Sequence, residues 1–224
     1  MMLLGADALR ALPVFPLPRT VFFPATKLAL HLFEPRYRAM MRDCVERGPQ
    51  AMAVTLLRPG WDADYEGRPP MCTIAGAGRI CSHTRNADGT YDVLLEGVAR
   101  VSLEELPAND LPYRRARAVV LEDGVASRPI SSSELSALLT AAASVVSALR
   151  RGHPTFELGV EPGTAPARIA DVIADRLIAE PGQRQALLEM LDPVARIGVV
   201  TSAVVELLGM IAGGSAGGGS ALAH

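Results

Sequence analysis

The sequence predicts an α+β protein in which a β-rich region is followed by a helical region. Between residues 12 and 122 the apolar residues alternate, or run in short stretches broken by proline and glycine, which is typical of short strands. From residue 131 onward the apolar residues recur with a period near 3.6, which is typical of helices. Strands first and helices after them indicate an α+β arrangement.

The β-rich region opens with a segment that cannot be helical. Four prolines lie between residues 13 and 24, and each lacks a backbone N–H and fixes φ. The apolar residues between them, which include Phe22 and Phe23, fit short strand pieces at a sheet edge or bend. Leucine then alternates with other residues from 28 to 32, and this period of two predicts a strand.

A short amphipathic helix is predicted directly after that strand. Pro35 suits a first helical turn, and Glu34 suits the positive end of a helix dipole. Apolar residues from Tyr37 to Val45 recur at i, i+3, i+4, i+7 and i+8, which is one helix face. Gly48 and Pro49 end the helix.

The rest of the β-rich region contains several strand patterns and one long polar loop. The loop spans 58–70 and holds the sole tryptophan, while Asn86 to Gly89 form a hairpin turn signal. Gly97 marks a break or bulge within a long strand. The predicted strands are 51–57, 71–74, 79–84, 91–103 and 114–121.

Four helices are predicted in the second region. Ser131 and Glu134 form a capping box that starts a long helix, which ends near Gly152. Thr164 is the expected cap of the second helix. A short third helix follows Pro181, and Pro193 starts the fourth, whose inward residues reach position 208.

These patterns divide the chain into five segments. The helical and β-rich segments together would form one domain over 12–211. The segments are a leader at 1–11, a β-rich lobe at 12–122, a linker at 123–130, a helical lobe at 131–211 and a flexible Gly/Ser/Ala tail at 212–224.

Several motifs in this order resemble the N-terminal, substrate-binding domain of Lon proteases. They are LPVFPL, VFFP and LHLFEPRYRAMM near the start, YDVLLEGVARV with its step from Gly97 to Arg100, and RIADVIADRL followed by QRQALLEMLDPVARI. The resemblance extends over residues 12–208. It implies a small PUA-like closed β-barrel lobe with a helical bundle behind it. It also implies a role in binding polypeptide substrates.

Composition and charge restrict the functional classes. A net charge of −2 provides no global basic field for nucleic acid. Three cysteines fit a reducing compartment better than a disulfide scaffold. The N-terminus lacks the pattern of a secretory signal, and the apolar stretch 197–212 is too short and too amphipathic to span a bilayer. We therefore expect a cytoplasmic protein that does not contact a membrane.

The chain shows no sign of an ATP-driven motor or a Lon-type peptidase. An ATP site needs a glycine-rich loop that ends in Gly-Lys-Ser/Thr, and the sole lysine, Lys27, lies outside any such loop. Lys27 precedes an alternating strand and is not near a serine-bearing turn, so a structural lysine is the expectation. The sequence thus predicts a non-catalytic, stand-alone recognition domain.

Two further patterns resemble a zinc site and a dinucleotide-binding loop, but structural roles explain both better. Cys72, Cys81 and His83 lack the close ligand pairs of structural zinc sites. Gly76 and Gly78 lack the third glycine and the following helix of a dinucleotide loop, so close strand packing or a bulge is expected. No metal and no cofactor are predicted.

The loop 58–70 is the best candidate for recognition, because exposed aromatic residues carry much of the binding energy between proteins. Trp61 and Tyr65 lie in this loop, and the alternative is that Trp61 folds down as a lid on the barrel. Asp62, Asp64 and Glu66 beside them are expected to be solvated, although paired acids can act in catalysis. The predicted recognition surface consists of Phe22, Phe23, Trp61 and Tyr65.

Three charged residues of the resemblance motifs are expected to be structural. Glu34, Arg36 and Arg100 are predicted to make local ion pairs, although the arginines could bind a carboxylate.

The leading hypothesis is a module that binds unfolded or damaged polypeptide and assists proteolysis or quality control. Clients would bind by apolar contact in a groove between the lobes, with strand addition to a sheet edge as a further mode. The partners would be such clients or a separate protease. The first alternative is RNA binding, which the basic strand from Arg114 to Arg117 favours and the aromatic content of 4% opposes. The second alternative is a small-molecule hydrolase that uses the acidic loop.

Overall fold

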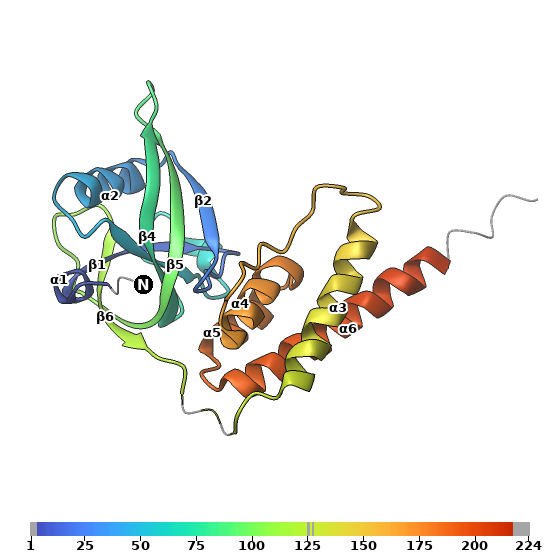
Figure 1. The fold of residues 1–224 in the computed structure, drawn as a ribbon. Coiled ribbons are helices and arrows are strands. Elements are labelled where there is room, and N and C mark those ends of the chain that lie inside the picture. Colours follow the sequence, from blue (N-terminus) through green and yellow to red (C-terminus); the bar gives the residue numbers. More distant parts are fainter. Residues whose placement is uncertain (1–3, 125, 127, 217–224) are drawn as a thin grey trace, which may run out of the picture. The chain divides into compact units, whose positions relative to one another are not determined.

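The protein is described by a computed structural model that covers residues 4–124, 126 and 128–216. It divides into two compact units (Figure 1). The β-rich unit runs to Glu122 and includes Pro181–Glu189, and the helical unit comprises Asp123–Glu180 and the chain from Met190. The α+β class predicted from the sequence is confirmed.

The β-rich unit is built on a closed ring of five strands. The ring order is β5-β4-β3-β1-β6, and it closes because β6 also pairs with β5. β2 lies outside the ring and pairs with β5. The strands are β1 (Leu12–Leu17), β2 (Lys27–Leu32), β3 (Ala51–Leu56), β4 (Ile74–Arg85), β5 (Tyr91–Glu105) and β6 (Arg114–Leu121).

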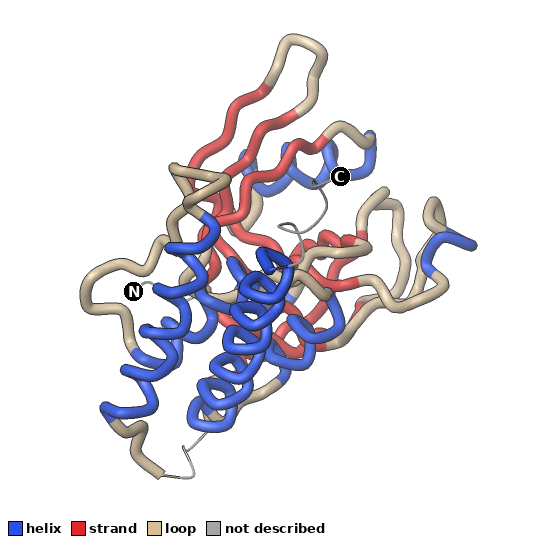
Figure 2. Tube along the Cα trace, turned by 90° about the vertical axis from the view of Figure 1, so that its right-hand side faces the viewer, coloured by secondary structure: helices blue, strands red, loops and turns tan. Residues whose placement is uncertain are grey.

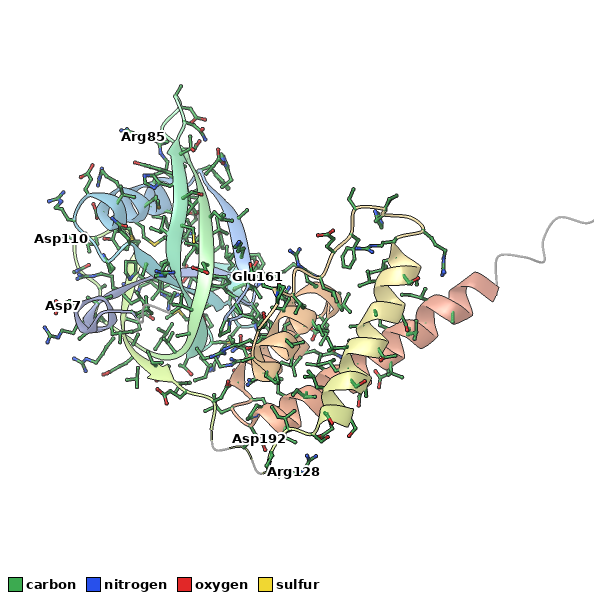
Figure 3. The ribbon with its side chains drawn as sticks, in the orientation of Figure 1. Asp7, Arg85, Asp110, Arg128, Glu161 and Asp192 are labelled. Atoms are coloured by element: carbon green, nitrogen blue, oxygen red, sulfur yellow. The ribbon has the colours of Figure 1, made fainter. Side chains whose placement is uncertain are left out.

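β4 is one continuous strand, where the sequence indicated two separate pieces. Its register with β5 shifts between Ala77 and Gly78 and again between Ile80 and Ser82, so bulges absorb the irregularity. β4 and β5 continue beyond the ring as a hairpin, which projects at the top of Figure 2, with Arg85 near its tip in Figure 3. The hairpin turn is closed by the N–H of Gly89, which donates to the Asn86 carbonyl at 2.9 Å.

Glycines let the segment between β1 and β2 lie directly against the sheet. A Cβ atom at Gly76 would be 1.9 Å from the Phe22 carbonyl oxygen, and one at Gly97 would be 2.1 Å from that of Phe23. Gly97 also exchanges backbone hydrogen bonds with this segment, because it accepts from the N–H of Ala25 and donates to the Thr26 carbonyl. The glycines therefore serve close backbone packing.

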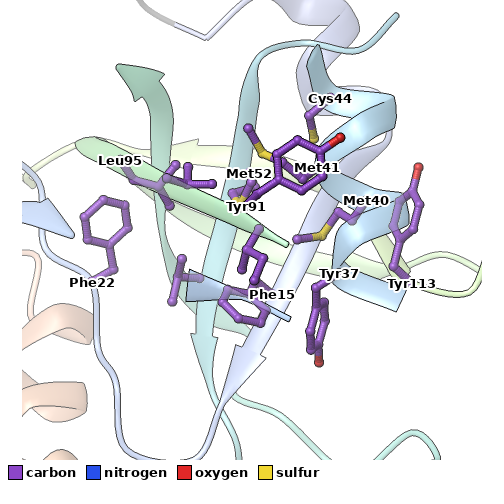
Figure 4. Close-up of a cluster of buried hydrophobic side chains, with 13 residues drawn as sticks. Phe15, Phe22, Tyr37, Met40, Met41, Cys44, Met52, Tyr91, Leu95 and Tyr113 are labelled. Carbon is purple, nitrogen blue, oxygen red and sulfur yellow. The ribbon is translucent and has the colours of Figure 1, made fainter. Parts of the chain in front are cut away.

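Two apolar clusters fill the β-rich unit. The interior of the ring is packed mainly by alanine, with Val14, Val101 and Leu103 as larger members. A second cluster lies between the sheet and helix α2 (Pro35–Glu46), and Figure 4 shows it with Phe22 beside Leu95. It consists of Phe15, Phe22, Leu32, Tyr37, Met40, Met41, Cys44, Met52, Val54, Tyr91, Val93, Leu95 and Tyr113.

Helix α5 (Pro181–Glu189) belongs to the β-rich unit, although the sequence grouped it with the other helices. Nε of the buried Arg100 donates to the Leu188 carbonyl at 2.9 Å, near the negative end of this helix. At the other end, Arg184 donates to the Val21 carbonyl at 2.9 Å, and its guanidinium lies 5.8 Å from the centre of the Phe23 ring. Polar side chains thus fasten α5 to the barrel.

The helical unit consists of α3 (Ser132–Leu149), α4 (Pro166–Leu177) and α6 (Pro193–Ala216). The predicted capping box is present, because the Glu134 N–H donates to Ser131 Oγ and the Glu134 carboxylate accepts from the Ser131 N–H. The cap predicted at Thr164 is wrong. Ala165 is the N-cap residue, since Pro166 occupies the first helical turn.

A buried ion cluster, which the sequence analysis missed, joins α4 to α6. Arg196 Nε lies 3.1 Å from the Asp171 carboxylate, and both side chains are fully buried. The Arg196 guanidinium also pairs with Asp123 at 2.7 Å, and Arg168 pairs with Asp171 at 3.2 Å. Arg196 and Asp171 are thus paired where water is excluded, and the partly exposed Asp123 and Arg168 complete the cluster.

Two described helices are long and apolar enough to cross a membrane by length and composition alone. They are α3 and the Pro193–Gly213 part of α6. The second contains the stretch 197–212, so the prediction that this region is too short and too amphipathic to span a bilayer is wrong by length and composition. Core helices of soluble proteins share this length and composition.

The two ends of the chain differ in detail from the predicted segments. A short helix, α1 (Ala6–Arg10), lies within the predicted leader. α6 continues through residues 212–216 of the predicted flexible tail. Residues 1–3 and 217–224 lie outside the described residues, as do 125 and 127 of the predicted linker.

Candidate functional site

Phe22 and Phe23 do not form a recognition surface. Their side chains are 2% and 0% exposed, because the segment that carries them packs against β4, β5 and α5. A fully buried ring cannot touch a ligand on the surface. The prediction for these two residues is therefore wrong, because both belong to the buried core.

Trp61 and Tyr65 lie together at the surface of the β-rich unit. Gly60 adopts a φ of 87°, in the left-handed region that favours glycine, and a short 3₁₀ helix, η1 (Trp61–Asp64), follows it. The two rings meet edge to face with their centroids 5.5 Å apart, and both side chains are half-buried. Their aromatic surface therefore stays within reach of a partner.

Tyr65 fastens this loop to the start of α2. Its hydroxyl donates to the Glu34 carboxylate at 2.8 Å, and Arg36 donates to the Tyr65 carbonyl at 3.2 Å. Glu34 and Arg36 are themselves paired, with Nε of the arginine 2.9 Å from the carboxylate. Burial and the hydrogen bond to Glu34 raise the pKa of Tyr65, so its hydroxyl remains a neutral donor.

A second ion cluster holds the other end of the loop. The Glu105 carboxylate accepts from Arg68 at 3.1 Å and from Arg114 at 2.8 Å. Arg114 also donates to the Pro69 carbonyl at 2.7 Å. Burial opposes the charge of Glu105, but the hydrogen bonds from Arg114 and Arg68 outweigh it and lower the pKa of this carboxyl.

Between the contacts of Tyr65 and those of Glu105, the surface forms a small hollow of about 80 Å³. Small-molecule and cofactor sites usually measure about 300–1,000 Å³, so the hollow suits a single side chain. Residues from five separate parts of the sequence line it: Pro16, Arg36, Tyr37, Leu57, Tyr65, Glu66, Gly67, Arg68, Pro69, Leu111, Pro112, Tyr113 and Arg114.

Two tyrosines at the base of the hollow belong to the core cluster beneath it. Tyr37 packs edge to face against Phe15 with ring centroids 4.4 Å apart (Figure 4). Tyr113 donates its hydroxyl to Asp43 at 2.9 Å. Burial is the main cause that raises the pKa of both tyrosines. The base of the hollow is thus rigid, aromatic and uncharged at neutral pH.

The sequence analysis found the loop but missed most of the hollow. Tyr37, Arg68, Tyr113 and Arg114 line it, yet they are separated by up to 77 positions in the sequence (114 − 37). No spacing rule links such positions, because ring closure between β5 and β6 and the position of α2 bring them together.

The other sequence-predicted residues lie apart from the hollow. Lys27 begins β2, and Arg100 lies buried beneath α5. Within the described ranges, no group of three His, Cys, Asp or Glu residues could hold a metal ion. Cys81 contacts Glu96, with 3.8 Å from sulfur to oxygen, and His83 lies on the same hairpin.

The arginines on β6 are largely neutralised by glutamates on β5. Arg114 pairs with Glu105, and Arg117 pairs with Glu104 at 3.0 Å, directly across the antiparallel register. Paired cations attract phosphate weakly compared with a free basic strip. The basic strand that favoured RNA binding in the sequence is therefore weaker support than its composition indicated.

Comparison with known proteins assigns the family. Residues 11–206 match the family described as the ATP-dependent protease La (LON) substrate-binding domain. The chain belongs to this family, as its motifs indicated. The match lies within the substrate-binding domain and includes neither an ATPase nor a peptidase domain.

Named relatives are much longer than this chain. It is 31% identical over 196 residues to Lon protease 2 of Myxococcus xanthus, a match that spans 87% of this chain and 23% of that protein. It is 29% identical to Lon protease of Anaeromyxobacter dehalogenans over the same fractions. The chain therefore spans about a quarter of the length of these relatives.

Solved structures share the fold. A Lon N-terminal domain protein from Xanthomonas campestris superposes with a TM-score of 0.59 at 23% identity, covering 86% of this chain and 97% of that one. The N-terminal domain of a Mycobacterium avium complex Lon protease gives 0.62 at 14% identity, covering 87% and 98%. The closed barrel with a C-terminal helical region, which the resemblance implied, is confirmed.

Proposed function

We propose that this substrate-recognition module binds segments of unfolded polypeptide and that the hollow beside loop 58–70 anchors one side chain of the bound segment. The observation that supports this most directly is the composition of that surface. Tryptophan, tyrosine and arginine dominate binding hot spots between proteins. Here tyrosines and arginines line one hollow, and Trp61 packs against Tyr65 at its margin.

The size and polarity of the hollow suit a side chain with an apolar body. A volume of about 80 Å³ exceeds the roughly 30 Å³ share of a water molecule, but it is smaller than a cavity that holds benzene, about 150 Å³. Aromatic faces of Tyr37 and Tyr113 form the base, so water released from them favours apolar contact. Arginines at the rim can meet backbone carbonyls of the client.

Such a surface would select unfolded chains because folded proteins rarely expose apolar side chains next to free backbone. Binding that depends on one small anchor is weak, which suits a domain that must release clients. A protease that receives these clients, or simple sequestration, would complete the role in quality control. The three free cysteines support a reducing compartment, and we place the proposed activity in the cytoplasm.

Fluorescence anisotropy of a labelled, reduced and alkylated polypeptide that cannot refold tests the proposal. We expect saturable binding by the protein and a loss of about tenfold or more in affinity for Trp61→Ala and Tyr65→Ala. Phe156→Ala is the matched control, because Phe156 is another half-buried aromatic but lies in the helical unit. Circular dichroism of each variant shows whether the fold is intact.

Two parallel titrations can contradict the proposed function. A folded protein of similar charge should not bind, whereas a labelled single-stranded RNA tests the first alternative. Salt-sensitive RNA binding without polypeptide binding would replace the proposal by nucleic-acid recognition. Equal losses for Phe156→Ala and Trp61→Ala would show that the hollow is not the anchor.

A further inference from the structure

β2 is an edge strand attached to the outside of a closed ring. Within the described part of the chain, β2 pairs with β5 and with no other strand. The pairing runs from Lys27 opposite Glu96 to Leu32 opposite Tyr91 without a register shift. Every second residue of β2 must therefore direct its backbone N–H and C=O groups away from β5. Figure 1 shows β2 beside β5, outside the ring.

This edge carries few of the features that usually protect an open strand. Natural sheets block their edges with proline, bulges, inward charges or covering segments. β2 contains no proline, and its pairing with β5 has no bulge. Lys27, at its first residue, is its single formally charged side chain. A six-residue strand is also long enough to pair with an added strand of ordinary length.

One face of β2 lies at the margin of the apolar cluster beneath α2. Leu32 is buried in that cluster, and Leu28 and Leu30 pack against it but remain partly exposed. Phe33, the residue after the strand, is 62% exposed and stacks on His31 with ring centroids 6.2 Å apart. An added strand would cover the exposed parts of these apolar side chains.

The opposite face has space for side chains. A shallow hollow of about 430 Å³ lies over the three strands β2, β5 and β4, and Ala29, Leu30 and His31 form its β2 margin. His31 Nδ1 lies 2.7 Å from the Asp92 carboxylate, directly across the β2–β5 pairing. A strand beside β2 would place alternate side chains toward this hollow.

We infer that an extended segment of a client polypeptide adds to the free edge of β2 as a further antiparallel or parallel strand. The inference rests on the proposed function and specifies a second contact for the same clients. Backbone hydrogen bonds supply affinity without regard to sequence, which suits a protein that must bind many clients. The hollow beside loop 58–70 then adds a side-chain preference.

The two faces of β2 define which segments fit. Positions that point toward Leu28 and Leu30 favour valine, isoleucine or other apolar residues. The alternate positions tolerate polar residues, and an acidic residue is favoured next to Lys27 because opposite charges attract across neighbouring strands. Segments with proline or with charges on both faces should not add.

Hydrogen–deuterium exchange measures strand addition directly. The probe is a peptide of about ten alternating valine and threonine residues, with a soluble tag, and the unfolded polypeptide of the anisotropy assay is used in parallel. About half of the amides in 27–32 should exchange quickly in the free protein. We expect their exchange to slow by about tenfold or more when either probe is bound.

N-methylated peptides and substitutions in the protein test strand addition further. A peptide with N-methyl groups on alternate residues loses its donors toward β2 and should bind about tenfold more weakly than one methylated on the other residues. Phe33→Ser should weaken binding several-fold. Val119→Ser is its matched control, because Val119 is 58% exposed on β6 and lies away from β2.

The outcomes separate this inference from the proposed function. Polypeptide binding with unchanged exchange in 27–32 would overturn strand addition and leave the hollow as the binding site. Equal affinity of the two methylated peptides would overturn it as well. Absence of any polypeptide binding, by contrast, would overturn the proposed function and the inference together.

Discussion

Two aromatic segments of the β-rich unit look alike in sequence and differ in the structure. The segment 21–26 carries Phe22 and Phe23, and the loop 58–70 carries Trp61 and Tyr65; both contain proline and follow a strand. The first is buried against the barrel, whereas the second stays half-exposed.

The difference comes from what each segment meets. Segment 21–26 lies over Gly76, Gly78 and Gly97, whose lack of side chains lets its backbone approach the sheet directly. The second half of loop 58–70 is held by side chains, because Tyr65 donates to Glu34 and Arg68 donates to Glu105. Aromatic residues thus become core where the opposing strands supply glycine, and remain available for binding where ion pairs hold the loop.

The largest difference should appear when each aromatic residue is removed. Phe23→Ala should destabilise the β-rich unit by about 3–5 kcal/mol, because it empties a fully buried site. Trp61→Ala should cost about 1 kcal/mol, since its ring is half-exposed and loses mainly the contact with Tyr65. Urea unfolding followed by circular dichroism measures both. Equal costs would contradict the contrast between the segments.

A smaller effect is expected from adding one methyl group beneath segment 21–26. Gly76→Ala places a Cβ atom 1.9 Å from a backbone oxygen, which forces the chain to move and should cost about 3 kcal/mol. Gly198→Ala, in α6, meets nothing within 4 Å and should stabilise the helical unit by up to about 1 kcal/mol. Changes of opposite sign in the free energy of urea unfolding would confirm the role of close packing. An unchanged free energy of unfolding in Gly76→Ala would refute it.

The elements that sequence patterns identify are those fixed by local rules. β6 has the predicted bounds, and the capping box at Ser131 starts α3 as expected, because strand alternation and helix caps depend on neighbouring residues. The same reasoning failed at Thr164, where two start signals compete and Pro166 decides the first helical residue.

Burial over long sequence separations could not be predicted in the same way. The aromatic character of Phe22 fits a surface hot spot and a core residue equally well, and the deciding partner, Gly76, is 54 positions away (76 − 22). The hollow itself depends on Tyr113 and Arg114 reaching loop 58–70 through ring closure. Only the resemblance to the Lon substrate-binding domain, which implies a closed barrel, indicated that residues so far apart in the sequence lie close together.

The smallest expected effect is a pH-dependent change in loop 58–70 that segment 21–26 should not show. Glu105 fastens loop 58–70, and its pKa is lowered below the ordinary 4.5 by Arg114 and Arg68. A lowered pKa contributes stability that is present above 4.5 and is lost as the pH falls through the folded-state value. The emission of Trp61, the sole tryptophan, reports this loop, so we expect it to shift to the red as the pH falls through this lowered pKa, while barrel circular dichroism persists.

Glu105→Gln is the control for this transition. The amide cannot carry the charge that Arg68 and Arg114 share, so the variant should show the red-shifted emission already at neutral pH and lose the acid transition. Segment 21–26 packs against the barrel through apolar side chains and glycine contacts, so its environment should not change over the same pH range. An acid transition that survives in Glu105→Gln would assign the loop's attachment to another group.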